Sequence, residues 1–233
     1  MNLKDSVFDK RYLQWTLIAF IPHLLGLVLA WNNPHNIYYW GLLSTLLYGY
    51  LIGLIVKTVQ DLPWKIGYAN WVSLIRLGIL HVLFIFHATI SDIVLLGSFI
   101  GILILDGIDG YLARKYHHET RQGAALDNET DAVMTLFLAW IHVSNELIPG
   151  WILIPGGLRF LYAWIVFVLP GHNKKDLIPR KIRATISITF LISLFFPFVF
   201  KTYAVEILVS VTGSLIIVSF LLSSFLNVFT KLR

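Results

Sequence analysis

The sequence contains no cysteine and few charged residues for its length. Of its 233 residues, 13% are Asp, Glu, Lys or Arg, about half the share that soluble domains carry. The absence of cysteine excludes disulfide bonds and thiolate metal sites. The shortage of charge excludes a protein whose whole surface faces water, because too few charged side chains remain to cover it.

Long apolar runs take up most of the chain, whose mean hydropathy is +0.74. A helix that crosses a membrane needs about 20 mostly apolar residues. Runs that meet this requirement are Leu13–Trp31, Ile37–Val56, Asn70–Thr89, Ile93–Leu112, Leu126–Asn145, Trp151–Leu169, Ile182–Phe200 and Tyr203–Val228. We therefore expect an all-α, polytopic transmembrane bundle of about eight spans. Residues 1–69 form an N-terminal accessory segment of two spans, and residues 70–233 form a six-helix core.

The basic residues support this count and set an orientation. Of the 18 Lys and Arg residues, Arg76 and Arg159 lie inside expected spans and Lys201 lies on one side of the membrane. All the others fall on the opposite side, where both termini lie. Because basic loops stay in the cytoplasm, the termini are expected to be cytoplasmic, in the cell (inner) membrane if the source is bacterial. The formal charge of +5 is explained by these loops, so we expect no nucleic-acid partner.

Ionisable residues at membrane depth are costly and usually functional. Asp106 and Asp109 are spaced i, i+3, and Asp127 and Asp131 are spaced i, i+4, so that each pair shares one helix face. Four facing carboxylates repel one another, and either protonation or bound cations must offset that repulsion. Two divalent ions would balance the charge, and oxygen ligands without His or Cys suit Mg²⁺ or Mn²⁺. Arg76, in contrast, either extends to the interface or takes a functional role.

Small and basic residues beside the carboxylates suit a pyrophosphate ligand. Gly110 and Gly123 remove side chains where a ligand can approach the backbone. Arg114 follows Gly110 by one helical turn and can neutralise phosphate. Paired metals at such a site polarise the phosphoryl group, and one carboxylate can accept the proton of an attacking hydroxyl.

The segment 106–131 resembles the signature of the CDP-alcohol phosphatidyltransferase family, D-x2-D-G-x2-A-R-x8-G-x3-D-x3-D. Every fixed position is filled at the required spacing, by Asp106, Asp109, Gly110, Ala113, Arg114, Gly123, Asp127 and Asp131. The resemblance implies two Mg²⁺ or Mn²⁺ ions per active site. Asp106, Asp109 and Asp127 would bind one ion, and Asp106, Asp127 and Asp131 the other. It also implies that Asp131 is the general base.

The same resemblance implies a set of residues that hold the CDP-linked donor, most simply CDP-diacylglycerol. They are Gly110, Ala113, Arg114, Gly123, Thr120 of the variable segment, and Asn70 and Ser73, which open the third span as N-x-x-S. It further implies a six-helix core, a place in the lipid bilayer and a homodimer.

The expected reaction transfers a phosphatidyl group to an alcohol and releases CMP, as a step of phospholipid biosynthesis. Glycerol 3-phosphate is the first choice of acceptor, because basic residues are available for its phosphate: Arg159, Arg180, Lys181 and Arg183. Inositol phosphate meets the same requirement. Serine or a second phospholipid needs less positive charge, and CDP-choline or CDP-ethanolamine is an alternative donor. The basic loop is equally consistent with attraction to anionic lipid headgroups.

Two other classes of function remain open. A transporter or ion channel could use buried carboxylates and arginines as a cation path, although no internal repeat of the kind common in carriers is present. A non-catalytic membrane scaffold would keep the fold, but such a protein would tolerate the loss of an aspartate, and here none of the four is missing.

Overall fold

The computed structural model describes residues 3–32, 37–58, 68–116, 121–158, 161 and 178–229, and within these ranges it contains helices and no strand. The α-helices are α1 (Leu3–Asn32), α2 (Ile37–Thr58), α3 (Tyr68–Phe86), α4 (Asp92–Lys115), α5 (Arg121–Ser144), α7 (Arg180–Ser193) and α8 (Tyr203–Phe229). Three short 3₁₀ helices join them: η3 (His87–Thr89), η4 (Gly150–Ile152) and η5 (Phe196–Phe198). Residues 153–158 are also helical.

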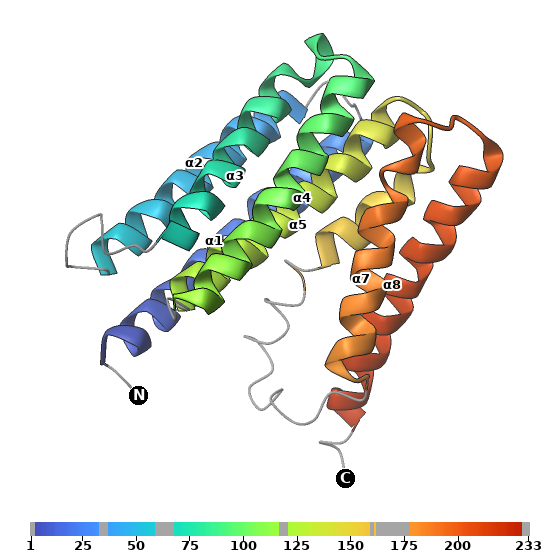
Figure 1. The fold of residues 1–233 in the computed structure, drawn as a ribbon. Coiled ribbons are helices and arrows are strands. Elements are labelled where there is room, and N and C mark those ends of the chain that lie inside the picture. The colour runs from blue at the N-terminus through green and yellow to red at the C-terminus, as the bar shows by residue number, and fades with distance from the viewer. Residues whose placement is uncertain are drawn as a thin grey trace.

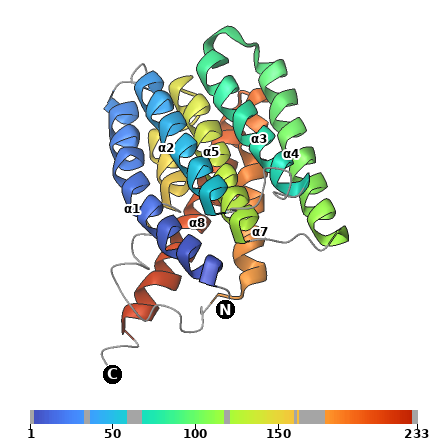
Figure 2. The ribbon, with the colours of Figure 1, turned by 90° about the vertical axis from the view of Figure 1, so that its left-hand side faces the viewer.

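Consecutive helices pack as pairs around α5. The closest pairs are α1 with α2, α3 with α4, and α7 with α8. Helix α5 packs on α3 and also touches α1, although neither is its neighbour along the chain. Figures 1 and 2 show the long helices running side by side in one bundle, with α5 between the α3–α4 pair and the α7–α8 pair.

Helix α5 is the centre of the bundle because it is apolar on all sides beyond its first turns. Residues 132–134 and 136–142 are buried, as expected for a helix without a polar face. Phe137 lies 4.6 Å from Phe84 of α3 and 5.6 Å from Phe99 of α4, measured between ring centroids. These tilted and edge-to-face contacts fix the spacing of the three helices that carry the aspartates.

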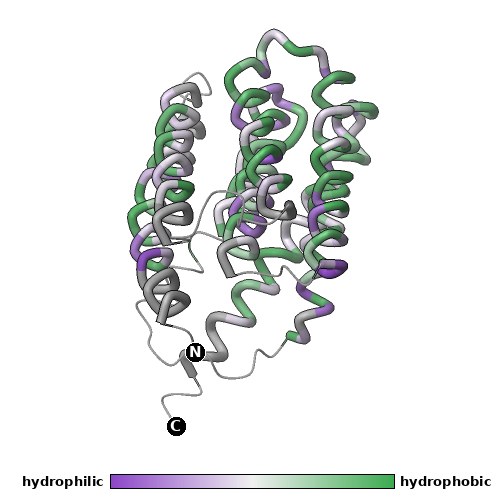
Figure 3. Tube along the Cα trace, turned by 60° about the vertical axis from the view of Figure 1, so that its left-hand side comes forward, coloured by the Kyte–Doolittle hydropathy of each residue, from purple (hydrophilic) through white to green (hydrophobic). Residues whose placement is uncertain are grey.

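The outer surface of the bundle is apolar, whereas several polar residues lie inside. Ile93 is 71% exposed and Ile104 is 59% exposed, while Arg76 is fully buried. Figure 3 shows many hydrophobic residues (green) along the coloured parts of the helices, interrupted by hydrophilic ones (purple). Four helices in the described ranges are long and apolar enough to cross a membrane: Trp71–Thr89, Asp92–Lys115, Lys181–Phe198 and Tyr203–Ser223. This arrangement suits a bundle whose solvent is lipid.

The all-helical prediction is confirmed for the described residues, but the count of about eight spans is not. Helices α1, α2 and α5 lie where spans were expected, yet they are not among the four. The first half of α5 is acidic, because it carries Asp127, Glu129 and Asp131. The expected span Trp151–Leu169 falls mostly outside the described residues. The division at residue 69 stays a prediction.

The two N-terminal helices dock closely on the rest of the bundle. A Cβ atom on Gly26 of α1 would overlap the ring of Trp40 on α2, and one on Gly41 of α2 would overlap the ring of Phe84 on α3. Both glycines therefore let an aromatic ring pack against the backbone of the next helix. A separate apolar cluster joins α1 and α2 to α3 and α5; it consists of Trp15, Ala19, Tyr48, Leu51, Leu77, Ala125, Leu126 and Val133.

Candidate active site

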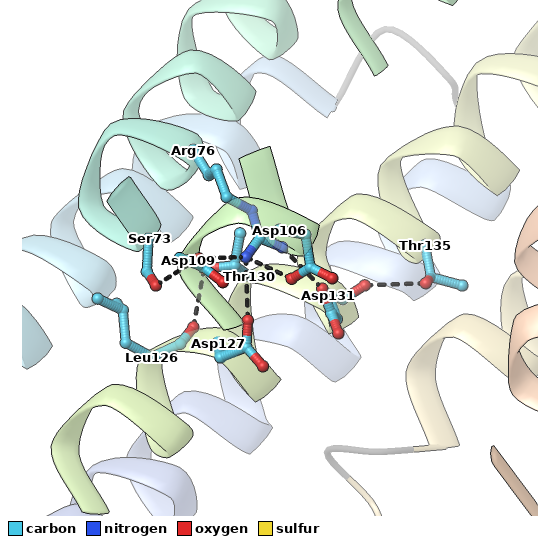
Figure 4. A network of polar contacts seen from close by, with 9 residues as sticks. All are labelled: Ser73, Arg76, Asp106, Asp109, Leu126, Asp127, Thr130, Asp131 and Thr135. Atoms are coloured by element: carbon cyan, nitrogen blue, oxygen red, sulfur yellow. Dashed lines mark hydrogen bonds and ion pairs between the residues drawn. The ribbon is translucent and has the colours of Figure 1, made fainter. Parts of the chain in front are cut away.

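The four aspartates of segment 106–131 come together around one arginine (Figure 4). Asp106 and Asp109 lie near the end of α4, and Asp127 and Asp131 lie in the first turns of α5. The i, i+3 and i, i+4 spacings turn each pair toward α3, where the guanidinium of Arg76 lies between them.

Arg76 contacts all four carboxylates. Its Nη1 donates to Asp109 Oδ2 at 2.9 Å and to Asp127 Oδ1 at 2.9 Å, and its Nη2 donates to Asp131 Oδ1 at 3.0 Å. An ion pair joins Nη1 to Asp106 Oδ1. One guanidinium offsets only one of four formal negative charges. The cluster of four carboxylates would therefore be stabilised by additional cations or by protonation.

The cluster of four aspartates has one side that is buried in the bundle and another, the open side, that is exposed. Arg76 is fully buried and the side chain of Asp109 is 7% exposed. The hydroxyl of Ser73 on α3 donates to Asp109 Oδ2 at 2.9 Å, which gives this buried carboxylate a second partner. The side chains of Asp106, Asp127 and Asp131 are 37%, 42% and 49% exposed. Ligands can therefore reach these three carboxylates from the open side.

The carboxylates fit a divalent metal. Asp106, Asp109 and Asp127 each offer one carboxylate oxygen, and these oxygens all lie within 4.8 Å of one another. Oxygen ligands from two facing helices are the donor set that Mg²⁺ and Mn²⁺ prefer. These are the three residues that the family resemblance implies for the first ion, and their role as metal ligands stays a prediction.

The residues predicted to hold the donor continue from the aspartates along α4. A Cβ atom on Gly110 would lie 3.3 Å from Nη1 of Arg114, so the absence of a side chain at Gly110 lets this guanidinium fold back over the backbone. Arg114 is exposed, and Ala113 and Gly123 are half-buried. A cationic, accessible surface thus borders the open side of the carboxylates.

A cavity of about 540 Å³ adjoins Asp131. Asn128, Asp131 and Thr135 of α5 line one wall, Arg183, Ser187 and Phe190 of α7 line another, and Ile216, Ser219 and Ser223 of α8 close it. Asp131 is the one member of the four aspartates that lines this cavity, and it also binds Arg76. Asp131 therefore lies between the other three aspartates and a cavity large enough for a small molecule.

The comparison with protein families agrees with this geometry. A family model described as CDP-alcohol phosphatidyltransferase matches residues 66–224, which is more than half of the chain. The matched region contains Arg76 and all four aspartates. The chain belongs to the CDP-alcohol phosphatidyltransferase family. No curated protein and no solved structure matches it.

Membership of the CDP-alcohol phosphatidyltransferase family makes the chain an integral membrane transferase of phospholipid biosynthesis. The family uses CDP-alcohol and alcohol substrates in a membrane, and it generally requires a divalent metal. The sequence prediction of the family is thereby confirmed. Residues 1–65, which include α1 and α2, lie outside the matched region.

Some residues predicted for this phosphatidyltransferase site are not described. Thr120 and Arg159 lie outside the described residues, and the side chains of Asn70 and Arg180 are likewise not described. Lys181 is exposed and is not among the described residues that line the cavity, whereas Arg183 does line it. Of the four cations predicted for an acceptor phosphate, Arg183 is thus the one seen beside Asp131.

Arg76 is the residue whose place the sequence left undecided. The alternative that its side chain extends to the membrane interface is wrong, because the side chain is fully buried and its guanidinium binds the aspartates. One signal was present: Arg76 follows Ser73 by three residues, so these two side chains share a face of α3. That face turned out to meet the carboxylates.

Proposed function

We propose that this protein transfers the phosphatidyl group of CDP-diacylglycerol to the primary hydroxyl of glycerol 3-phosphate and releases CMP. The proposal depends on one observation: Asp131 belongs to the cluster of four aspartates around Arg76 and also lines the cavity beside α7 and α8. A base in this position can act on an acceptor in the cavity while the donor lies against the other three aspartates.

The donor side is supported by the charge and accessibility of α4 and α5. Asp106, Asp109, Asp127 and Asp131 would hold two Mg²⁺ or Mn²⁺ ions. When bound, these ions polarise the phosphoryl group and stabilise the entering and leaving oxygens. Arg114, folded over Gly110, supplies a positive charge for the cytidine diphosphate, and Ala113 and Gly123 keep the surface free of bulky side chains.

The chemistry that falls to the chain itself is positioning and proton transfer. Asp131 accepts the proton of the acceptor hydroxyl, and the hydroxyl oxygen forms a bond to the phosphorus that carries the diacylglycerol. The bond between that phosphorus and the bridging oxygen breaks, and CMP leaves with the electron pair. Phosphoryl transfer of this kind depends chiefly on orientation and charge. Arg76 keeps the Asp131 carboxylate in place for the step.

The acceptor side is supported by the lining of the cavity. Arg183 offers a positive charge for a phosphate, and Asn128, Thr135 and Ser187 offer hydrogen-bonding groups for hydroxyls. This combination favours a small phosphorylated polyol. The basic residues at the start of α7 lie on the side of the membrane proposed to be cytoplasmic, where such an acceptor is available. The homodimer implied by the sequence resemblance stays a prediction.

The test is product identification. Purified protein in detergent receives Mg²⁺, labelled CDP-diacylglycerol and one acceptor at a time, and mass spectrometry identifies the lipid formed. We expect phosphatidylglycerol phosphate and one CMP per product. An Asp92→Asn variant is the matched control, because Asp92 lies at the opposite end of α4 and pairs with Lys201. Product with inositol phosphate, serine or a second phospholipid instead would replace the acceptor, and no CMP with any acceptor would refute the transfer.

A further inference from the structure

Helix α5 carries a third carboxylate that faces away from the other two. Glu129 lies two residues from Asp127 and two from Asp131, so at 3.6 residues per turn it points about 200° away from each. Its side chain is buried, and the residue is 2% exposed. A carboxylate buried in a membrane bundle needs a hydrogen-bonding partner.

One partner of Glu129 comes from the N-terminal helix α1. The hydroxyl of Tyr12 on α1 donates to Glu129 Oε1 at 2.6 Å, across 117 positions of sequence. This is a short hydrogen bond of the kind that ionised acceptors form. Helix α5 is therefore held on one face by Arg76 of α3 and on the opposite face by Tyr12 of α1.

Tyr12 is itself fixed by its neighbours. Its ring stacks on that of Trp15, with centroids 6.0 Å apart and planes within 9°. Trp15 is fully buried, and its Nε1 donates to the carbonyl of Leu47 on α2 at 2.9 Å. A continuous series of contacts thus runs from α2 through α1 to the helix that carries the proposed base.

The apolar cluster of α1 and α2 reaches the same two helices beside the active site. Leu77 of this cluster follows Arg76 directly on α3, and Leu126 precedes Asp127 directly on α5. The matched family region begins at residue 66, so it assigns no role to α1 or to Tyr12.

We propose that α1 and α2 position the active site, and that the Tyr12–Glu129 hydrogen bond fixes the rotation of α5 about its axis. The inference rests on the proposed function only in taking Asp127 and Asp131 as metal ligands. A carboxylate about 6 Å from a helix axis moves roughly 1 Å when the helix turns by about 10°. An error of that size is enough to cost about 100-fold in rate. Tyr12 and Glu129 are positioning residues, because neither contacts the reacting groups.

The test separates positioning from stability by measuring three quantities on each full-length variant. They are Mn²⁺ affinity by electron paramagnetic resonance, the kcat of CMP release, and the melting temperature in detergent. Tyr12→Phe removes the hydroxyl alone. We expect it to weaken Mn²⁺ binding and lower kcat by about 10-fold or more. Ser193→Ala is the control, because it removes a buried hydrogen bond of 2.9 Å between α7 and α8 and lies on neither α1 nor α2. It should lower the melting temperature and leave Mn²⁺ affinity and kcat unchanged.

Substitutions of Glu129 keep the test decisive if Tyr12→Phe does not fold. Glu129→Gln retains an oxygen that accepts from Tyr12, and it should keep Mn²⁺ affinity within a few-fold of wild type. Glu129→Leu removes the acceptor of the Tyr12 hydroxyl and also the cost of burying a carboxylate, so we expect the melting temperature to change little while Mn²⁺ affinity and kcat fall. Glu129→Leu with wild-type Mn²⁺ affinity and kcat would overturn the proposal. Mn²⁺ binding without CMP release by wild type would refute the proposed reaction but leave the positioning test intact.

Discussion

Arg76 brings one positive charge into a cluster of four carboxylates, and this imbalance leaves the cluster with an excess of negative charge. Its two Nη atoms are within 3.0 Å of oxygens from Asp109, Asp127 and Asp131. The guanidinium makes the buried side of the group stable, because Asp109 would otherwise lack a cation. The exposed carboxylates remain accessible to other cations, as the proposed divalent metals require.

The base assignment is tested by Asp131→Asn. Asn keeps the size of the side chain and one oxygen, but it cannot accept the proton of the acceptor hydroxyl. We expect kcat for CMP release to fall by about 100-fold or more, with Mn²⁺ binding partly retained by the other three aspartates. The assay is CMP release from CDP-diacylglycerol under saturating Mg²⁺. Turnover like that of wild type would show that another group is the base.

The charge balance is tested by Arg76→Met, which leaves the carboxylates without their cation. We expect the variant to lose about 3 kcal/mol or more in the absence of divalent ions. Mg²⁺ should then raise its melting temperature by more than it raises that of wild type. Lys201→Met is the control, since its partner Asp92 is exposed and surface ion pairs contribute little. An equal Mg²⁺ effect on Arg76→Met and wild type would mean that Arg76 and the metals do not interact.

At the scale of elements, the sequence predicts contacts within the signature far better than contacts between helices. The spacing of Asp106 with Asp109, and of Asp127 with Asp131, places each pair on one face of its helix. Arg76 contacts Asp109 and Asp131 over 33 and 55 positions of sequence. No local pattern encodes such pairings, because they depend on how α3 packs in the finished bundle. The same holds for Tyr12 and Glu129.

The contact between α2 and α3 at Gly41 can be tested by a substitution that fills it. Gly41→Ala places a Cβ atom where the Phe84 ring now packs. Overfilling of this kind costs about 1–3 kcal/mol, so we expect a lower melting temperature in detergent. Gly49→Ala on the same helix meets nothing within 4 Å and is the matched control. Alanine is the better helix former, so Gly49→Ala should be neutral or slightly stabilising. Equal effects of the two substitutions would show that α2 does not dock through Gly41.

At the scale of the whole molecule, the composition predicts that the outer surface faces lipid, but it does not predict how the helices pack. Low charge and long apolar runs indicate a helical membrane protein, and the exposed isoleucines and buried polar residues agree. The number of spans is harder to predict, because a central helix such as α5 and a lipid-facing helix are both apolar. Helix α5 also carries three carboxylates in its first half, which a count of apolar residues alone does not anticipate.

The absence of cysteine makes the proposed orientation directly testable. Lys201 and Lys115 lie at opposite ends of the α4 region, since Lys201 pairs with Asp92 and Lys115 ends α4. Single Lys201→Cys and Lys115→Cys variants would each carry one thiol. In intact cells, a membrane-impermeant maleimide should label the first and not the second, and permeabilisation should expose both. The reverse pattern would invert the topology, and equal labelling in intact cells would show that the bundle does not separate these ends.

The central claim is that carboxylates of α4 and α5 form a cation-dependent site for transfer from a CDP-linked lipid. The most direct measurement is the rate of CMP release by purified wild-type protein as Mg²⁺ is titrated from zero, with CDP-diacylglycerol and glycerol 3-phosphate present. We predict no release in a chelator, a saturable rise with Mg²⁺, and its loss in Asp109→Asn, which removes the buried ligand. Release that continues in the chelator, or that survives Asp109→Asn unchanged, would contradict the claim.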